Sequence, residues 1–496
     1  MKPATLLIRA DASLAIGTGH VMRCLALAQA WQAAGGATSL AATELPDALA
    51  PRVTSEGVAL TWIRAIPGSP ADALETLGQA RRTGADWVVI DGDRFGSDFL
   101  ATVRAAGFRV LLIDDFADRE SFPADLIVNP DLDDDGHPYR KRGATARLLL
   151  GPSYILLRRE FRQEIEKDTI RKIGNRILIT LGGSDPENLS PEIASALAAC
   201  PDLEITVIAG AGFNKVEDLR TLEASKLRVI FNPPNMAPFM RDADLAIVVA
   251  GGTLWELLSM GCVVLSYSRN IAQARVIQSL SRRGVLIDMG QTDHFESSKL
   301  VTSVKELVAS GVARQRMTTI GRALVDGRGA ARVVEAVQQV GSVRMLPMTA
   351  SDQDAFLCMA VQHFVELNSS FVPQRDWKEH YFSTIMANPL FFLRWIIVEE
   401  KRAGFILFGI EKHRFLPRTT GVIYELYIAP EFRRRGIASI SASDAIRELQ
   451  AHNPSKIQLE VIEGRAAAVA LWESLGFQRV TGRFVLHGRE MSGGGL

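Results

Sequence analysis

Residues 16–24 read Ile16-Gly17-Thr18-Gly19-His20-Val21-Met22-Arg23-Cys24 and follow the apolar run Thr5–Arg9. This order predicts a strand, a glycine turn and a helix that begins near His20, because glycine permits a tight turn and close backbone approach. The turn at Gly17 and Gly19 leaves free N–H groups that favour an anion at the helix start. Arg23, one helical turn further on, could sense a phosphate there. His20 beside that anion is a candidate general base, because imidazole accepts a proton near neutral pH. A simple βα turn with a hydrogen-bonded surface histidine is the alternative.

The composition bounds the class of protein. The 496 residues carry 56 basic and 56 acidic side chains, and 47% of them are hydrophobic. This suits about three packed domains and favours neither a sequence-independent nucleic-acid binder nor a polybasic membrane surface. The four cysteines are scattered, and no apolar run reaches the roughly 18 residues of a membrane span. We expect a cytoplasmic protein with no nucleic-acid or membrane partner and, lacking a His/Cys/Asp cluster of ligand spacing, no metal.

Two series of short apolar runs alternate with helical patterns. Continuous apolar strands between helices are typical of a parallel sheet covered on both faces, so each series predicts an α/β domain with such a sheet. A dinucleotide site is disfavoured, because Met22 stands where the G-x-G-x-x-G fingerprint needs a third glycine. The expected strands are 5–11, 38–42, 60–63, 87–91, 110–114 and 126–129, then 176–181, 204–209, 228–232, 245–249, 262–266 and 285–288.

Acidic residues stand at several strand ends, namely Asp11, Asp91, Asp114 and Asp115. Open α/β sheets bind ligands at the carboxyl ends of their strands, so we expect some of these carboxylates to face a cleft. The alternative is that Asp91 and Asp115 cap loops or the helices that follow.

Two more glycine turns follow strands of the second series, at residues 181–185 and 250–256. Backbone N–H groups there, with the Thr253 hydroxyl, could hold a diphosphate. Glu256, one turn into the helix, could accept both hydroxyls of a ribose, or it could be an ordinary first-turn acid that complements the helix dipole.

These motifs match a known family. Over about residues 4–340 the chain resembles the UDP-2,4-diacetamido-2,4,6-trideoxy-β-L-altropyranose hydrolases of pseudaminic acid biosynthesis, through Arg9-Ala10-Asp11, residues 16–25, Asp114-Asp115, residues 151–154, residues 181–185 and Gly251-Gly252-Thr253. The resemblance implies a GT-B pair of Rossmann-like lobes, 1–165 and 166–340. It also implies inverting, metal-independent hydrolysis of a UDP-activated amino sugar, with water activated by His20. The implied UDP and sugar contacts are Gly183, Ser184, Gly252, Thr253, Glu256, Asn270 and Gln273. A GT-B glycosyltransferase is the alternative.

A third segment begins near Val343. A strand at 343–347, a helix at 351–366, two hairpin strands at 392–400 and 403–411 joined at Lys401-Arg402, and a strand at 421–429 precede a basic turn and a helix. The turn fits the R/Q-x-x-G-x-G/A pyrophosphate loop of GNAT acetyltransferases, and residues 471–477 are similar to a second segment of that family. The resemblance, over 343–490, implies an acetyl-CoA site formed by Arg433, Arg434, Arg435, Gly436, Ile437 and Ala438.

The catalytic groups of this segment depart from the GNAT pattern. Trp472 stands where many members have a tyrosine that protonates the thiolate, and indole is a poor acid. Glu425 is then the best candidate general base. Two functions stay open: an N-acetyltransferase acting on the 4-amino group of the UDP-sugar, or a non-catalytic CoA-binding or assembly module. We also expect this domain to fold around its own core.

Overall fold

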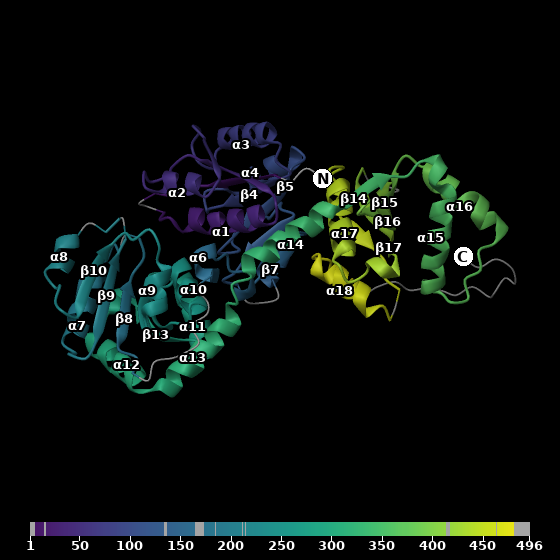
Figure 1. The fold of residues 1–496 in the computed structure, drawn as a ribbon. Helices are drawn as coiled ribbons and strands as arrows, with labels where there is room; N and C mark the ends of the chain where they lie inside the picture. The colour runs from purple at the N-terminus through teal and green to yellow at the C-terminus, as the bar shows by residue number, and fades with distance from the viewer. Residues whose placement is uncertain are drawn as a thin grey trace.

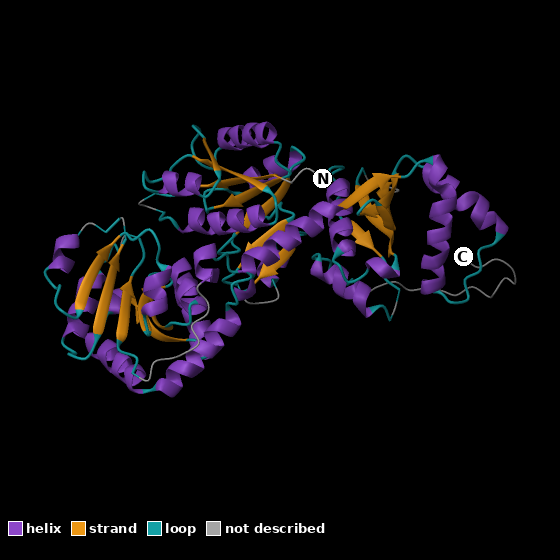
Figure 2. Cartoon of the chain, viewed as in Figure 1, coloured by secondary structure: helices purple, strands orange, loops and turns teal. Residues whose placement is uncertain are grey.

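The computed structural model describes residues 5–13, 16–132, 136–163, 173–183, 185–210, 212–213, 215–412, 417–462 and 464–480. Three sheets follow one another along the chain (Figure 1). In the two N-terminal parts helices lie on both faces of the sheet (Figure 2). The predicted fold class, two Rossmann-like parallel-sheet lobes followed by an α+β domain, is confirmed.

The first lobe is a parallel sheet with the strand order β3-β2-β1-β4-β5-β6-β7. Its three central strands are buried along their whole length or at every residue but the first, which explains their nearly continuous apolar sequence. The strands are β1 (Thr5–Ala10), β2 (Ala37–Ala42), β3 (Ala59–Trp62), β4 (Trp87–Asp91), β5 (Arg109–Ile113), β6 (Leu126–Asn129) and β7 (Arg147–Leu150). The helices are α1 (Gly19–Ala33), α2 (Leu49–Ser55), α3 (Pro70–Thr83), α4 (Ser97–Ala105), α5 (His137–Lys141) and α6 (Arg159–Gln163), with the 3₁₀ turn η1 (Pro152–Tyr154).

The second lobe repeats this plan with the strand order β10-β9-β8-β11-β12-β13, again parallel throughout. Its strands are β8 (Arg176–Thr180), β9 (Glu204–Ala209), β10 (Leu227–Phe231), β11 (Leu245–Val249), β12 (Val263–Ser268) and β13 (Leu286–Gln291). Its helices are α7 (Leu189–Ala198), α8 (Val216–Arg220), α9 (Ala237–Asp242), α10 (Gly252–Ser259), α11 (Ile271–Arg282), α12 (Ser297–Ala309) and α13 (Gly311–Leu324), with the 3₁₀ turn η2 (Thr292–His294).

The third domain is a mixed sheet in which β14 to β17 pair antiparallel and β18 joins β17 in parallel. The strands are β14 (Val343–Pro347), β15 (Phe391–Val398), β16 (Lys401–Lys412), β17 (Thr419–Ile428) and β18 (Ile457–Leu459). The helices are α15 (Gln353–Leu367), α16 (Arg375–Ala387), α17 (Ile437–Gln450) and α18 (Ala466–Ser474), with the 3₁₀ turns η3 (Ala350–Asp352) and η4 (Pro430–Phe432).

The hairpin turn of this domain differs from the expected one. It lies at Glu399-Glu400, not at Lys401-Arg402, because Val398 pairs directly with Lys401. Both glutamates have positive φ, 49° and 63°, as a two-residue hairpin loop requires. Glycine and asparagine usually supply that conformation, so a Glu-Glu pair is no local signal for the turn.

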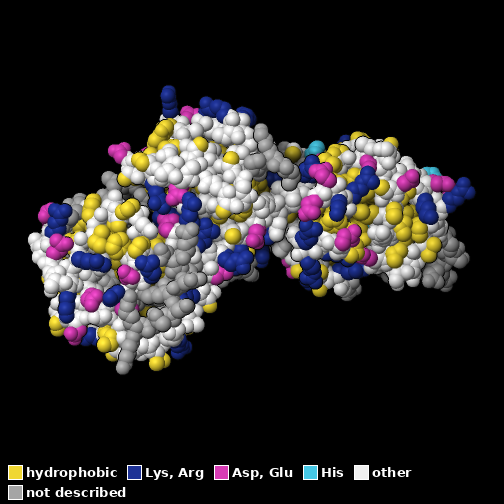
Figure 3. All heavy atoms as spheres, viewed as in Figure 1, with side chains coloured by type: hydrophobic (Ala, Val, Ile, Leu, Met, Phe, Trp, Pro, Cys, Tyr) yellow, Lys and Arg dark blue, Asp and Glu magenta, His cyan; other side chains and the backbone are white. Residues whose placement is uncertain are grey.

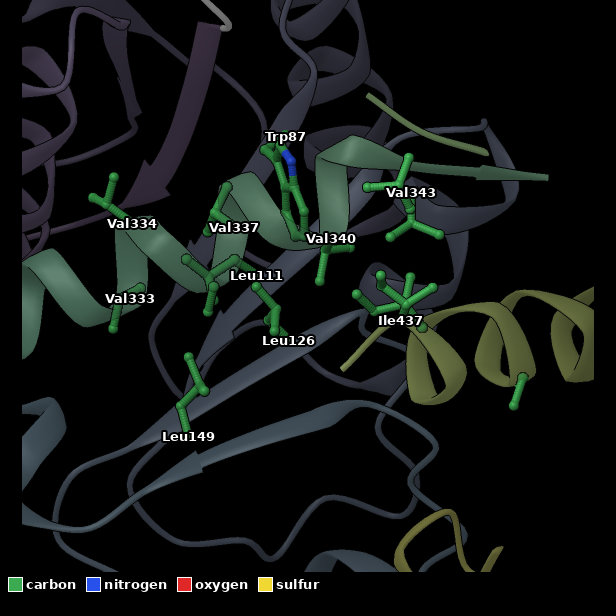
Figure 4. Packing of buried hydrophobic residues seen from close by; sticks show 14 of the residues in the cluster. Trp87, Leu111, Leu126, Leu149, Val333, Val334, Val337, Val340, Val343 and Ile437 are labelled. Carbon is green, nitrogen blue, oxygen red and sulfur yellow. The ribbon is translucent and has the colours of Figure 1, made fainter. Parts of the chain in front are cut away.

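Helix α14 (Gly329–Ser342) joins the second lobe to the third domain but packs on the first lobe. Its buried face belongs to the same hydrophobic cluster as Trp87 and Leu126 of the first sheet and Ile437 of α17. In Figure 4, Val340 lies between Leu126 of the first lobe and Ile437 of α17, and Val343 follows at the start of β14. The expectation of a separate core for the third domain is therefore wrong, because α14 contacts α1 of the first lobe as well as α17 and β14 of the third domain and so joins their buried residues into one cluster.

The visible surface carries no single-sign region. Basic and acidic side chains are interspersed on the face seen in Figure 3, in agreement with a formal net charge of zero. Among the described residues, no helix is long and apolar enough to span a membrane.

Candidate active sites

His20 lies in the first turn of α1, where the chain leaves β1 through the predicted glycine turn. Gly17 has φ +76° and its amide bonds back to the Ser13 carbonyl, so the turn needs the backbone freedom of glycine. His20 Nδ1 is 2.7 Å from Oδ1 of Asp91, the last residue of β4. Strand β4 pairs with β1, and this adjacency brings the two residues together across 71 positions of sequence.

Arg23 binds two of the acidic strand ends. Its Nε and Nη2 donate to Asp91 at 2.7 and 2.6 Å, and its Nη1 donates to Asp115 at 2.6 Å. Asp91 is fully buried, whereas the side chain of His20 is 18% exposed. We call His20, Arg23, Asp91 and Asp115 the His20 cluster. In this cluster the partly exposed imidazole of His20 is hydrogen-bonded to the buried carboxylate of Asp91, whose charge is balanced by Arg23.

The electrostatics of this cluster set the protonation of both partners. Burial by itself lowers the pKa of His20, but the Asp91 carboxylate outweighs it, so the pKa is raised above the ordinary value. Burial likewise opposes ionisation of Asp91, but Arg23 and then His20 hold the pKa of Asp91 well below its usual range. An ionised Asp91 accepts the proton of Nδ1, which leaves Nε2 as the basic nitrogen of a neutral His20.

The other two strand-end carboxylates hold the fold together. Asp11 pairs with the fully buried Arg9 at 2.8 Å and accepts the Thr43 amide at 2.6 Å. Asp114 binds Arg119 and accepts the Tyr139 hydroxyl at 2.7 Å. Of the four acids, only Asp91 and Asp115 contact His20 or Arg23 in the hydrogen bonds of the described residues.

The second-lobe turn before α10 is open. A Cβ built on Gly251 or Gly252 meets nothing within 4 Å, so the amides of the first turn border free space. Thr253 follows on this turn and is half-buried. Glu256, one turn later, accepts from Arg158 at 3.0 Å; burial raises the pKa of Glu256 although Arg158 opposes the shift.

A hydrogen bond between the lobes places the turn before α10 near the His20 cluster. Trp255 of α10 donates its indole N–H to Asp131, beyond β6, at 3.0 Å. The Asp131 carboxylate in turn interacts electrostatically with Asp115 and Arg23. The glycine turn of the second lobe and the histidine of the first thus belong to one region between the lobes.

The remaining predicted contacts of this lobe lie on two neighbouring loops. Asn270 caps α11 by accepting the Gln273 amide at 2.9 Å, and Gln273 accepts the Arg269 amide at 2.8 Å. The Arg269 side chain reaches the first glycine turn, donating to the Leu181 carbonyl at 3.1 Å. Gly183 lies on that turn, in open space, and Ser184 lies outside the described residues.

In the third domain Glu425 of β17 has a partner that sequence reasoning missed. His363 of α15 places Nε2 2.6 Å from Glu425 Oε2. The His363 ring also packs on Phe405 and Tyr427, with centroid distances of 5.7 and 5.3 Å. The available signal was its place three residues after Ala360 and seven after Phe356, on the buried face of its helix.

The basic turn before α17 has the geometry of an anion loop. Gly436 has φ +74° and caps the helix, and Ile437 and Ala438 form its first turn. Arg433 is bound to Glu366 at 2.8 Å, and Arg435 to Glu399 at 3.2 Å. Two of the three predicted phosphate-binding arginines are therefore already paired with carboxylates, while Arg434 is exposed at φ +62°.

Trp472 is 8% exposed and packs edge-on against Phe477 at 5.5 Å. It is a core residue of the third domain. Among the described residues, no group of three or more His, Cys, Asp or Glu side chains is placed to hold a metal ion.

Comparisons with known proteins find matches for both the N-terminal and the C-terminal parts of the chain. Residues 359–477 match the family described as "Acetyltransferase (GNAT) family". An uncharacterized protein of Methanocaldococcus jannaschii is 22% identical over 95% of this chain and 96% of its own length. The spore coat polysaccharide biosynthesis protein SpsG of Bacillus subtilis is 29% identical over 39% of this chain and 59% of its length. The UDP-2,4-diacetamido-2,4,6-trideoxy-beta-L-altropyranose hydrolase of Campylobacter jejuni is 25% identical over 57% of this chain and 98% of its length.

A solved structure supports the fold of the two lobes. The glycotransferase of kitacinnamycin superposes on 68% of this chain and 99% of its own with a TM-score of 0.51, at 17% sequence identity. The chain therefore joins a pair of lobes with the fold of the GT-B glycosyltransferases to a C-terminal domain of the GNAT family.

Proposed function

We propose that the chain is a bifunctional nucleotide-sugar enzyme. Its two lobes hydrolyse UDP-2,4-diacetamido-2,4,6-trideoxy-β-L-altropyranose to UDP and the free sugar, and its third domain transfers an acetyl group from acetyl-CoA to the 4-amino group of the precursor. The observation that carries the hydrolase proposal is the His20–Asp91 pair at the lobe junction. The GNAT match and the hydrolase relative of Campylobacter jejuni support the two halves.

In the hydrolysis, neutral His20 takes a proton from water through Nε2 as the water oxygen attacks the anomeric carbon. The bond from that carbon to the β-phosphate oxygen breaks, and UDP leaves with the electron pair. Asp91 holds Nδ1–H and stabilises the imidazolium that forms. Attack opposite to the leaving group inverts the configuration.

The departing UDP needs compensation for its negative charge. The free first-turn amides of α10, at Gly252 and Thr253, supply it together with the positive end of the helix. Glu256 lies one turn further and accepts the ribose hydroxyls in this proposal. Its contact with Arg158 orients the carboxylate. Gly183, on the first glycine turn of this lobe, is a further UDP contact in this proposal, and Asn270 and Gln273 contact the sugar.

Hydrolysis in H₂¹⁸O tests this half. Attack at the anomeric carbon puts one ¹⁸O on the free sugar and none on UDP, and proton NMR of the first product reports inversion. The His20→Asn variant should lose turnover and keep UDP affinity. Label in the β-phosphate, or turnover that requires a second sugar as acceptor, would contradict the proposal and favour a glycosyltransferase.

For acetyl transfer, Glu425 accepts a proton from the 4-ammonium group of the acceptor, directly or through water. The free amine attacks the thioester carbonyl, the C–S bond breaks, and CoA leaves as the thiolate, which takes up the remaining extra proton of the nitrogen, directly or through water, to give the amide and CoA thiol. His363, at 2.6 Å, holds the Glu425 carboxylate in place. Mass spectrometry of the UDP-4-amino-sugar with acetyl-CoA should show a gain of one acetyl group. CoA binding without acetyl transfer would leave only the binding-module function.

A further inference from the structure

In the loop before α17, fewer arginines are free to bind an anion than the sequence Arg433-Arg434-Arg435 suggests. Arg433 and Arg435 are engaged by Glu366 and Glu399, so their charges are balanced locally. A pyrophosphate at this loop meets the helix amides and Arg434, and two acidic side chains stand close behind. A cation from another element would add charge compensation for a multiply negative ligand.

Arg147 supplies a cation at this place from the first lobe. It is the first residue of β7, and its Nη1 lies 3.7 Å from where a Cβ on Gly436 would be. The same Nη1 donates to Gln339 Oε1 of α14 at 2.7 Å. Because that partner is a neutral amide, the contact holds the guanidinium beside the loop without cancelling its charge.

The position of Arg147 relative to the loop is set by the docking of α17 on the first lobe. Ser443 donates to the Thr145 carbonyl at 2.9 Å, two residues before Arg147. Arg447 binds Asp125 of the first lobe. A crevice lined by Arg147, Ser439 and Ser443, among others, runs along this contact. Arg147 is thereby held at the N-terminal end of α17.

We infer that Arg147 is a phosphate ligand of acetyl-CoA, so that the acetyl-CoA site is shared between the third domain and the first lobe. The guanidinium and the α17 amides face the pyrophosphate from two sides, and Gly436 between them leaves the space open. The inference rests on the proposed acetyl-CoA binding. It adds a ligand from outside the acetyltransferase domain, and it makes CoA affinity depend on docking of the first lobe.

The test compares Arg147→Gln with the full-length wild-type protein by calorimetric titration of acetyl-CoA. A charge-assisted hydrogen bond to phosphate predicts a loss of affinity of about 10- to 150-fold. Arg147→Lys should recover part of the affinity, since it restores the charge without the planar fork. Arg142→Gln is the matched control, because Arg142 is an exposed arginine of the same lobe. It should bind like wild type.

A second ligand separates phosphate recognition from a structural effect. S-acetylpantetheine carries the thioester but no phosphate, so its turnover by Arg147→Gln should equal that of wild type. Equal loss with both thioesters would mean that Arg147 only supports the fold and would overturn the inference. Unchanged acetyl-CoA affinity in Arg147→Gln would do so as well. A wild-type protein that does not bind acetyl-CoA refutes the proposed function itself.

Discussion

Replacing Asp91 by Asn tests the His20 cluster most directly. The change keeps the shape of the side chain but removes the charge that accepts the Nδ1–H of His20 at 2.7 Å. Arg23 keeps its second carboxylate, Asp115, at 2.6 Å, so its charge stays paired in the variant. The Asn amide can donate to Nδ1, which would move the imidazole proton to Nε2 and remove the basic lone pair.

The expected magnitude follows from the contact that is lost. In the transition state His20 is an imidazolium, and its hydrogen bond to the Asp91 carboxylate is worth about 1.5–3 kcal/mol. At about 1.4 kcal/mol per factor of ten, the rate constant should fall about 10- to 150-fold. The change of the His20 tautomer should lower the rate constant further, so the loss should be at least as large as this range.

The assay is UDP release as a function of pH. His20 must be neutral to act as the base, and Asp91 raises its pKa, so wild-type kcat/KM should rise with pH through that raised value. In Asp91→Asn the pKa of His20 falls, and the acid limb should move to lower pH while the plateau drops. UDP affinity, measured by titration, should stay unchanged.

A double-mutant cycle gives the refuting result. If Asp91 acts through His20, then adding Asp91→Asn to His20→Asn costs no further activity. Additive losses, or an acid limb that stays in place in the single variant, would show that Asp91 supports the lobe and not the imidazole. Far-ultraviolet circular dichroism of each variant checks that the fold is intact.

Three further outcomes are expected. Glu256→Gln, which keeps the shape beside Arg158, should weaken UDP binding by about 1–3 kcal/mol in a titration, and equal affinity would leave Glu256 as a first-turn acid only. Glu425→Gln should lower the rate of acetyl transfer about 10²- to 10⁴-fold with acetyl-CoA affinity unchanged, whereas unaltered turnover would remove it as the base. Gly436→Glu should abolish acetyl-CoA binding, because position 436 has a backbone φ of +74° and its side chain would lie between the helix amides and Arg147. UDP-sugar hydrolysis should persist in this variant. Loss of hydrolysis in a folded variant would show that the two activities are coupled.

Local patterns were enough to predict most of the elements. The strands at 87–91, 126–129, 204–209 and 245–249 have the predicted bounds, because each is a short, mainly apolar run followed within two residues by glycine or proline. Strand β7 and helix α16 were not predicted. Arg147–Leu150 is only four residues long, and α16 carries a mixed polar and aromatic sequence without a clean apolar stripe.

In the candidate sites, too, some residues could be predicted from local sequence and others could not. His20 and the turn at Gly436 are encoded locally, since glycines and a helix start stand side by side in the chain. The partners of these residues are not. Asp91 lies next to His20 because β4 pairs with β1 in the sheet, and His363 lies next to Glu425 because α15 packs on β17. Arg147 lies next to Gly436 only because the third domain docks on the first lobe. Sequence periodicity carries no information on such pairings.

The course of α14 determines which parts of the molecule can move. The helix is packed into the first lobe and runs directly into β14 of the third domain. For the function proposed above, separating the two lobes to admit UDP would then move the second lobe against a body made of the other two parts. The separation between His20 and the Gly436 loop stays constant through such a swing. The distance that an acetylated sugar nucleotide travels from the acetyl-CoA site to His20 would therefore be the same in the open and the closed enzyme.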